Sequence, residues 1–309
     1  MKTVTLIIPV FNEAEALAGN LEAILTQADG VADVDLQLLV VNDGSTDATL
    51  EVMQGFCESH PQTSLLSLNR NFGKEAAIMA GLDYVAGDAA IVMDSDLQHP
   101  PALIPQMLAI WQGGVAVVEA CKTARPSQST AYRLLARGFY ALFGSLTGMD
   151  LRNHSDFKLL DRKVIDAYRQ LPERGRFFRG LVTWLHFPTA QVYFTEPARE
   201  TGVSKWSGLR LLNLSWQSIS SFTSLPLHLV TLLGLFTFLV SLVLGGKALY
   251  DKLSGQALDG FTTVILLLLL IGSVLMFSLG LVGSYIARIY EEIKGRPVYL
   301  VDEQNSRLR

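Results

Sequence analysis

Charged residues are scarce in this chain of 309 residues: they make up 17% of it, against about 25% in an average soluble domain. The scarcity is local, because residues 211–287 carry only four charged side chains. Residues 1–120 hold 3 basic and 16 acidic side chains, whereas residues 121–210 hold 15 basic and 7 acidic ones. This distribution excludes an ordinary one-domain soluble enzyme, a disordered chain and a generally basic nucleic-acid binder. It indicates an acidic globular front, a basic middle and a membrane tail.

Cysteine is also scarce. Cys57 and Cys121 are too few for a disulfide framework or a zinc cluster, so we expect buried, reduced thiols. An N-terminal targeting segment is not evident either, since Asn12 and Glu13 follow the apolar run 3–10 too soon for a signal-peptide core. The front of the protein is therefore expected to stay in the cytoplasm.

Short β-branched runs alternate with helical patterns over the first 120 residues. This alternation predicts a mostly parallel α/β sheet. Ser45 is the expected N-cap of the helix that follows the second strand, and a third helix is expected over 73–85. The expected strands are 4–10, 36–43, 64–68, 89–94 and 114–120.

Polar side chains gather where these strands end. Ligands of such sheets bind outside the carboxyl ends of the strands, so four polar strand ends predict a binding crevice. The residues concerned are Asn12, Glu13, Asp43, Asn69, Arg70, Asp94 and Asp96.

Two stretches near the C-terminus lack charge, 225–246 and the region between Asp259 and Arg288. Each is long enough for the roughly 20 residues that cross a bilayer. The alternative is a helical hairpin buried in a large soluble core. Basic residues before the first stretch and after the second place both flanks in the cytoplasm by the positive-inside rule. Residues 130–146 and 208–222 have the pattern of helices that lie in the membrane interface, with ordinary packing against the sheet as the alternative.

The sequence Asp94-Ser-Asp96 places two carboxylates one residue apart at a strand end. Both can reach one hard cation, and Mg²⁺ or Mn²⁺ held in this way usually completes its coordination with substrate phosphates. The pattern is common by itself. Its weight comes from its position in the crevice shared with Asp43 and Glu13.

Six sequence blocks together resemble the membrane-bound GT-A glycosyltransferases of family 2. The chain is most similar to the polyprenyl-phosphate branch, which includes bactoprenol glucosyltransferases, dolichol-phosphate mannosyltransferases and undecaprenyl-phosphate aminoarabinose transferase. The blocks are PVFNE (9–13), VNDGSTD (41–47), NRNFGKEAAIMAGL (69–82), DSDLQHPP (94–101), SDFKLLDRKV (155–164) and RETGVSKWS (199–207).

The resemblance implies an α/β fold of the Rossmann-like GT-A type, with interfacial amphipathic helices and a C-terminal two-helix transmembrane hairpin. The expected domains are a cytoplasmic catalytic domain over 1–205, which includes an interfacial helix at about 129–147, a juxtamembrane helix over 206–224, transmembrane helices within 225–289 and a cytoplasmic tail over 290–309.

The resemblance also implies roles on the donor side. Asp96, with Asp94, would hold Mg²⁺ or Mn²⁺, Asp43 would pair with the base, and Gln98 would face the sugar. A turn residue that caps a helix is the alternative for Asp43. Lys74 could equally be a solvated lysine at a helix start. The implied donor and nucleotide residues are Pro9, Glu13, Asp43, Lys74, Asp94 and Gln98.

A phosphate acceptor is already anionic, so the enzyme has to supply positive charge and alignment for in-line attack. Attraction of anionic lipid headgroups is the alternative role for the basic residues. Asp156 would act as a base or position Arg133 or Lys205, and a capping or structural carboxylate is the other reading. The implied acceptor-phosphate residues are Arg125, Arg133, Arg199, Ser204 and Lys205, and the implied catalytic residues are Asp156, Arg199 and Lys205. Arg176 and Arg179 are left open between a phosphate clamp and the membrane edge, and His154 and His228 are interpreted as structural.

The function expected from the resemblance is inverting transfer of a hexosyl group, first of all glucose from UDP-glucose, to undecaprenyl or another polyprenyl phosphate at the inner face of the cytoplasmic membrane. Another donor such as GDP-mannose stays open. A processive polysaccharide synthase is a rival on the same fold, but no Q-x-x-R-W block occurs and two spans are too few for a channel. A non-catalytic membrane scaffold that binds nucleotide sugars is the third hypothesis. A homo-oligomer is an open partner, and nucleic acid is not expected.

Overall fold

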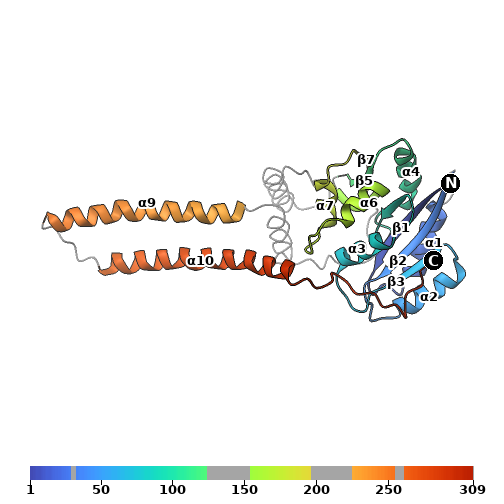
Figure 1. The fold of residues 1–309 in the computed structure, drawn as a ribbon, viewed down its shortest axis with the longest axis horizontal. Helices are drawn as coiled ribbons and strands as arrows, with labels where there is room; N and C mark the ends of the chain where they lie inside the picture. The colour runs from blue at the N-terminus through green and yellow to red at the C-terminus, as the bar shows by residue number, and fades with distance from the viewer. Residues whose placement is uncertain (29–32, 124–153, 196–224, 255–260, 309) are drawn as a thin grey trace. The chain divides into compact units, whose positions relative to one another are not determined.

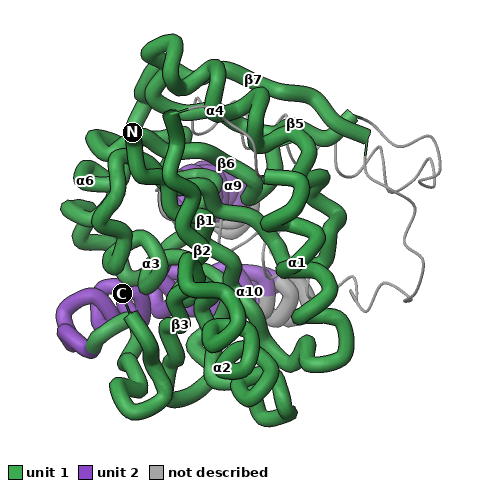
Figure 2. The backbone as a smooth tube through the Cα atoms, turned by 90° about the vertical axis from the view of Figure 1, so that its right-hand side faces the viewer, with its two compact units in different colours: residues 1–205, 297–309 green, residues 206–296 purple. Residues whose placement is uncertain are grey.

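The computed structural model describes residues 1–28, 33–123, 154–195, 225–254 and 261–308. The chain divides into two compact units, which Figure 2 distinguishes by colour. The first unit comprises residues 1–205 and 297–309, and the second comprises residues 206–296. Each unit is considered by itself below.

The first unit is built on a seven-stranded sheet with the strand order β3-β2-β1-β4-β6-β5-β7 (Figure 1). Only β6 runs antiparallel to its neighbours, so the sheet is mostly parallel as the sequence predicted. The strands are β1 (Lys2–Val10), β2 (Val34–Asn42), β3 (Thr63–Ser67), β4 (Ala89–Val92), β5 (Val117–Lys122), β6 (His154–Asp161) and β7 (Thr189–Phe194).

Helices cover both faces of this sheet. Helix α1 packs with α2 and α4, and helix α3 packs with α6, which in turn contacts α7. The close approach of α3 to β1 requires a glycine, because a Cβ at Gly81 would collide with the side chain of Ile7. The helices are α1 (Leu17–Ala28), α2 (Thr49–Ser59), α3 (Lys74–Tyr84), α4 (Ile104–Gln112), α6 (Arg162–Arg169) and α7 (Phe178–Trp184), with a short 3₁₀ helix η1 (Pro101–Leu103) before α4.

The expectation for Ser45 was wrong. Helix α2 begins after Ala48, and the Asp47 carboxylate accepts a hydrogen bond from the Thr49 N–H at 3.0 Å. The Ser45 hydroxyl instead accepts a hydrogen bond from the backbone N–H of Asn12 at 3.1 Å. Ser45 therefore links the loops that follow β1 and β2. Local turn chemistry could not reveal this use, because the partner lies 33 residues away.

Both cysteines are buried and neither forms a disulfide, as expected. The strand ends also lie close to their predicted positions, although β4 ends at Val92 and β5 begins only at Val117. The expected cytoplasmic tail over 290–309 includes residues that pack in the first unit. Its residues from 297 onward belong to the first unit, where Val301 and Arg307 form antiparallel bridges with Leu68 and Leu65.

The second unit contains the helices α9 (Leu225–Leu253) and α10 (Phe261–Ile293), which lie side by side in Figure 1. Both are long and apolar enough to cross a membrane, with candidate spans over Val230–Lys247 and Leu270–Ile293. Their large apolar side chains are mostly exposed within the chain, unlike those of a buried core hairpin. The two predicted interfacial segments, 130–146 and 208–222, lie outside the described residues.

Candidate functional site

A cavity of about 340 Å³ opens at the carboxyl ends of β1, β2 and β4. Six of the residues predicted from the sequence meet there, although they come from four separate blocks of the chain. Gln98 is not among the residues that line the cavity. The lining consists of Pro9, Val10, Phe11, Glu13, Asp43, Asn71, Gly73, Lys74, Asp94, Ser95 and Asp96.

Three carboxylates, those of Glu13, Asp94 and Asp96, form the acidic wall of this cavity. Burial raises the pKa of the Glu13 carboxyl, and the negative charges of Asp96 and Asp94 raise this pKa further. The hydrogen bond from the Ser95 hydroxyl opposes this shift without cancelling it. In the described part of the chain, no cation pairs with Glu13 or Asp96 within 4 Å. Hard oxygen ligands with unbalanced charge suit Mg²⁺ or Mn²⁺, so these residues fit a divalent cation.

The turn that carries two of these carboxylates is fixed from beneath by His99. The N–H of Asp94 donates to His99 Nδ1 at 3.1 Å, and the His99 ring stacks on Phe157 with 5.4 Å between the ring centroids. Burial lowers the pKa of His99, which favours the neutral ring that this acceptor role requires. Sequence reasoning gave His99 no role, although its position five residues after Asp94 was the available signal.

The same turn is closed by Gln98, whose backbone N–H donates to Asp96 Oδ1 at 3.1 Å. Leu97 between them has a φ of 56°, in the left-handed region that side chains rarely adopt. The strain is compatible with a turn that must aim two acidic side chains in one direction.

Asp43 is buried at the end of β2 and holds the loop after β3. Its two carboxylate oxygens accept hydrogen bonds from the backbone N–H groups of Phe72 and Gly73, at 2.8 and 2.9 Å. Burial raises the pKa of Asp43, and these two hydrogen bonds lower it in part. Asp43 does not cap α2, so the capping alternative was wrong. Each carboxylate oxygen keeps a second lone pair with which a ligand can bond.

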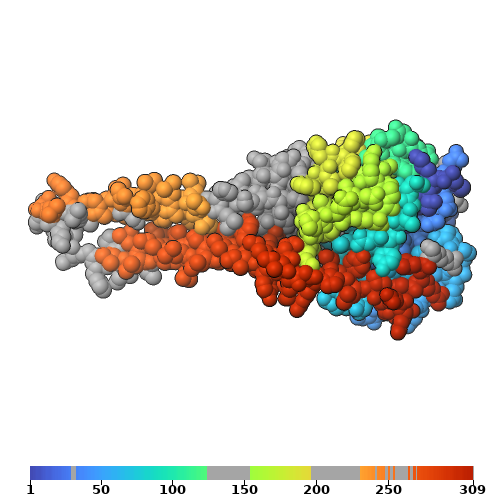
Figure 3. Space-filling view, viewed as in Figure 1, coloured from blue at the N-terminus to red at the C-terminus, as the bar shows by residue number. Residues whose placement is uncertain are grey.

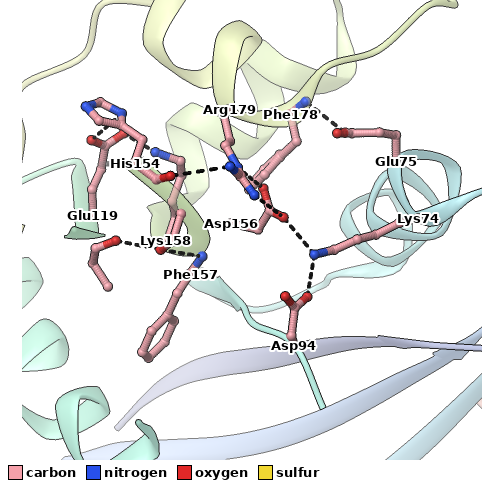
Figure 4. Close-up of polar contacts among 12 residues, drawn as sticks. Lys74, Glu75, Asp94, Glu119, His154, Asp156, Phe157, Lys158, Phe178 and Arg179 are labelled. Carbon is pink, nitrogen blue, oxygen red and sulfur yellow. Dashed lines mark hydrogen bonds and ion pairs between the residues drawn. The ribbon is translucent and has the colours of Figure 1, made fainter. Parts of the chain in front are cut away.

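Lys74 at the start of α3 joins two carboxylates on opposite sides (Figure 4). Its Nζ lies 2.5 Å from Asp94 Oδ1 and 2.7 Å from Asp156 Oδ2. Burial lowers the pKa of the Lys74 ammonium, but Asp156 and Asp94 together raise it above its ordinary value. Lys74 thus forms two ion pairs while 42% of its side chain remains exposed to solvent.

Asp156 lies in β6 and binds two cations. Arg179 contacts both of its carboxylate oxygens, through Nε at 2.5 Å and Nη2 at 2.9 Å, and Lys74 contacts Oδ2 (Figure 4). Burial raises the pKa of Asp156, but Arg179 and then Lys74 outweigh it and hold this pKa far below its ordinary value. A carboxylate held so firmly in its charged form is a poor proton acceptor. Its position inside a strand also excludes the capping alternative.

Arg179 and Arg176 both have protein partners. Arg179 extends from α7 to Asp156, and Arg176 donates to the backbone carbonyls of Tyr168, Leu171 and Glu173. Arg176 therefore stabilises the segment before α7, whereas Arg179 belongs to the polar network beside the cavity. Sequence spacing could not separate these two roles.

A second, fully buried ionic group lies further along β5 and β6. Lys158 contacts one oxygen of Glu119, and His154 Nδ1 lies 3.1 Å from the other (Figure 4). Potential metal-ligand atoms of Glu119, Cys121 and His154 lie within 4.8 Å of one another, a proximity that the sequence spacing did not reveal. Both carboxylate oxygens of Glu119 already have charged or polar partners. We therefore interpret this group as structural, as expected for His154.

The five residues expected to bind the acceptor phosphate, Arg125, Arg133, Arg199, Ser204 and Lys205, lie outside the described residues. His228 lies in α9, and its side chain is not described. The acceptor side of the site therefore remains a prediction.

Comparisons with known proteins agree with this geometry. The model of the family described as glycosyl transferase family 2 matches residues 5–169. The bactoprenol glucosyl transferase of Shigella phage SfII is 34% identical over 304 residues, covering 98% of each chain. An uncharacterized glycosyltransferase of Synechocystis is 36% identical over 301 residues, 97% of this chain and 94% of its own.

Among solved structures, the glucosyl-3-phosphoglycerate synthase of Mycobacterium tuberculosis in complex with Mn²⁺, UDP-glucose and phosphoglyceric acid has a TM-score of 0.52 and is 21% identical. The match covers 72% of this chain and 78% of that one, and it shows a shared fold. The sheet, the acidic strand ends and the full-length relatives lead to one conclusion: the chain is a glycosyltransferase with a GT-A-like fold and belongs to glycosyltransferase family 2.

Proposed function

We propose that this enzyme transfers glucose from UDP-glucose to a polyprenyl phosphate, undecaprenyl phosphate in the first instance, and releases UDP. The observation that carries the proposal is an acidic cavity at the carboxyl ends of β1, β2 and β4 in a chain that also has two long apolar helices. The donor sugar and the lipid acceptor are inferred from the full-length relatives named bactoprenol glucosyl transferase.

The donor would bind along the carboxyl ends of β1, β2 and β4. Pro9 and Asp43 would face the nucleoside, since both line the cavity on the β1–β2 side. Asp96 and Asp94 would hold Mg²⁺ or Mn²⁺, which supplies positive charge against the leaving diphosphate. Glu13 would add negative charge to that cation site. The hydrogen bond that Glu13 accepts from the Ser95 hydroxyl would fix the orientation of the Glu13 carboxylate. Gln98 would contact the sugar if the turn rearranges on donor binding.

Transfer to a phosphate acceptor needs little general-base catalysis. A phosphate monoester carries at least one negative charge at neutral pH, so its oxygen is already nucleophilic. Asp156 is held as a carboxylate by Arg179 and Lys74, which suits a positioning role better than proton transfer. We propose that Asp156 fixes the Lys74 ammonium beside Asp94, at the edge of the cavity where the diphosphate would lie.

Direct attack by the phosphate oxygen on the anomeric carbon, opposite the departing UDP, would invert the configuration there. The bond that forms joins the phosphate oxygen to that carbon, and the bond that breaks joins the carbon to the UDP oxygen. Arg125, Arg133, Arg199, Ser204 and Lys205 would neutralise and align the acceptor phosphate, because arginine matches phosphate oxygens in pairs and lysine acts as a point charge.

The two C-terminal helices would anchor the enzyme in the inner membrane. Helix α9 has 29 residues and α10 has 33, which at about 1.5 Å per residue exceeds the roughly 30 Å of a bilayer core. Exposed leucine, phenylalanine and valine side chains along both helices would face lipid. The catalytic unit would then lie on the cytoplasmic side, and the interfacial segments would bring the lipid headgroup to it.

A direct assay tests the proposal. Purified full-length protein is incubated with undecaprenyl phosphate, Mn²⁺ or Mg²⁺ and a panel of radiolabelled nucleotide sugars, including UDP-glucose and GDP-mannose. We expect label from UDP-glucose to enter the lipid phase only when the divalent cation is present. Label from another donor alone would replace the proposed sugar, and no transfer from any donor would overturn the proposal.

A single variant separates acceptor from donor binding. Lys205→Glu is expected to abolish transfer while UDP binding, measured by calorimetry, changes less than about twofold, since repulsion would act on the acceptor phosphate alone. Loss of UDP binding in this variant would show that Lys205 belongs to the donor site instead.

A further inference from the structure

The last residues of the chain, 297–308, form a segment that we call the C-terminal strap. It follows directly after the region of α10 in sequence but belongs to the first unit, where it runs along β3. In Figure 3 red residues of the C-terminal end lie against blue and cyan residues from the first part of the chain. Because β3 is the last strand on its side, one of its edges would otherwise expose unpaired backbone groups.

Main-chain and hydroxyl groups of the strap accept hydrogen bonds from two alternate N–H groups of this edge, those of Leu65 and Ser67. The Leu65 N–H donates to the carbonyl of Arg307 at 2.9 Å, and the Arg307 N–H donates back to Leu65 at 2.7 Å. The Ser67 N–H donates to the Ser306 hydroxyl at 3.0 Å. The strap therefore continues the sheet by an irregular antiparallel strand.

The contacts extend beyond β3 to the loop that enters the cavity. The Asn69 N–H donates to the Leu300 carbonyl at 3.1 Å, and the Asp302 N–H donates to the Ser67 carbonyl at 2.8 Å. The Tyr299 hydroxyl also donates to the Asp83 carboxylate at 2.8 Å, near the end of α3. The strap thus holds both ends of the region that leads from β3 through α3.

The loop fixed in this way forms part of the cavity. Asn71 and Gly73 line it, and the N–H of Gly73 donates to Asp43. Gly44, next to Asp43, has a φ of +62°, and a Cβ there would meet the backbone of Arg70. Such close backbone packing means that a displacement of Asn69 would be passed to the Asp43 side of the cavity.

We propose that the C-terminal strap is a positioning element of the donor site: by holding Asn69 it fixes the loop 70–73 and thereby sets the affinity for the nucleotide. The inference rests on the proposed function, because it takes the Asp43 side of the cavity as the nucleoside subsite. It also gives the end of the chain, after the proposed membrane helix, a role in substrate binding.

Two variants at one position test the backbone contact. Asp302→Pro removes the N–H that bonds to Ser67, and Asp302→Ala keeps that N–H while removing the same side chain. Both are made in the full-length protein, and three quantities are measured: the UDP dissociation constant with Mn²⁺, the KM values for donor and acceptor, and hydrogen exchange of a peptide that covers 69–73.

We expect Asp302→Pro to raise the UDP dissociation constant and the donor KM about five- to tenfold relative to Asp302→Ala, with the acceptor KM and kcat within twofold. Exchange at 69–73 should be about tenfold faster in the proline variant. If the proline variant does not fold, Ser306→Ala, which removes the hydroxyl that accepts from the Ser67 N–H and donates to the Asp302 carbonyl, should give the same pattern at about two- to threefold.

Equal UDP affinity and equal exchange in the two variants at 302 would overturn the inference. A loss of kcat with unchanged donor KM would also overturn it, because a merely structural strap would lower the active fraction and leave the affinity alone. Failure of the unsubstituted protein to bind UDP would instead overturn the proposed function on which the inference depends.

Discussion

The carboxylates on the two sides of Lys74 differ in how their negative charge is balanced. On the cavity side, Glu13 and Asp96 have no cation within 4 Å among the described residues, and burial, followed by the negative charges of Asp96 and Asp94, raises the pKa of Glu13. On the other side, Asp156 is held by Arg179 and Lys74, which keep its pKa low. The described residues thus supply no cation to Glu13 and Asp96, whereas they supply two to Asp156.

One sheet therefore carries acidic residues with protein cations beside them and acidic residues without such cations. The carboxylates on the cavity side follow the parallel strands β1 and β4, and the turns after these strands place them at the cavity. Asp156 lies within the antiparallel strand β6 and faces α3 and α7, which bring their own basic residues. Lys74 joins the two sides, because its ammonium contacts Asp94 as well as Asp156.

The largest effect on activity is expected from a substitution in the acidic wall of the cavity. Asp96→Ala is expected to lower kcat/KM by about a thousandfold. The cation would lose a ligand, and the leaving diphosphate would lose the charge stabilisation that the cation provides. Electron paramagnetic resonance of Mn²⁺ should show weaker binding by the folded variant. Glu15→Ala removes an exposed carboxylate nearby and serves as the control. Unchanged Mn²⁺ binding in Asp96→Ala would mean that the acidic wall is not the cation site.

The second effect concerns the backbone that supports Asp43. Gly44→Ala forces a Cβ into the backbone of Arg70 at a φ of +62°, so the loop 70–73 has to move. We expect the UDP dissociation constant, measured by calorimetry, to rise at least about tenfold. Gly19→Ala is the control, since nothing lies within 4 Å of a Cβ at that helical position. Equal UDP binding in both variants would contradict the placement of the nucleoside beside Asp43.

The third prediction concerns Asp156 and its ion pairs with Arg179 and Lys74. Asp156→Asn leaves Arg179 and Lys74 without their shared carboxylate, and we expect a loss of roughly 1–3 kcal/mol of stability after allowance for solvent screening of the partly exposed cations. The stabilising contribution of Asp156 is present above its unfolded pKa and is lost as the pH falls through its lower folded pKa. The stability difference should therefore stay constant between pH 5 and 8.

Activity profiles add a sharper measurement to the same variant. If Asp156 positions Lys74, Asp156→Asn should lower kcat/KM by about ten- to a hundredfold without changing the shape of its pH dependence. Asp166→Asn, which removes the partner of Arg162 on α6, provides the control. A limb of the profile that disappears only in Asp156→Asn would show that Asp156 takes up a proton in the reaction.

The smallest effect is expected at Glu75, which accepts a hydrogen bond from the Phe178 N–H at 2.8 Å. Burial and then the negative charge of Asp156 raise the pKa of Glu75 from 4.5 to about 7. A raised pKa means that its stabilising contribution is complete below pH 4.5 and is lost as the pH rises through about 7.

Glu75→Gln keeps an acceptor for the Phe178 N–H and removes the ionisation. Thermal melting should therefore show a gain of about 2–5 °C at pH 8 and a smaller gain at pH 5. Glu51→Gln on α2 is an exposed control. An equal change in melting temperature at both pH values would mean that Glu75 is not ionising inside the fold.

Most of the strands and the two long apolar helices could be predicted from the sequence alone. Alternating apolar runs and helical patterns located β1 to β5, because buried strands and amphipathic helices each leave a periodic signal in the chain. The uncharged stretches located α9 and α10 in the same way. Polar residues directly after the strands correctly predicted four residues of the cavity, since parallel strands bring their carboxyl ends to one edge. These are Glu13, Asp43, Asp94 and Asp96, whereas Asn12, Asn69 and Arg70 do not line it.

Only the tertiary structure decided the partners of those side chains. Lys74 reaches Asp156 across 82 positions of sequence, and Asp43 holds a loop about 30 residues away. Ser45 and the C-terminal strap also act through contacts between distant parts of the chain, which no local pattern records. Hydrophobic periodicity is a local property of the chain and can be read directly, whereas an ion pair or a hydrogen bond depends on which distant segment the fold places opposite.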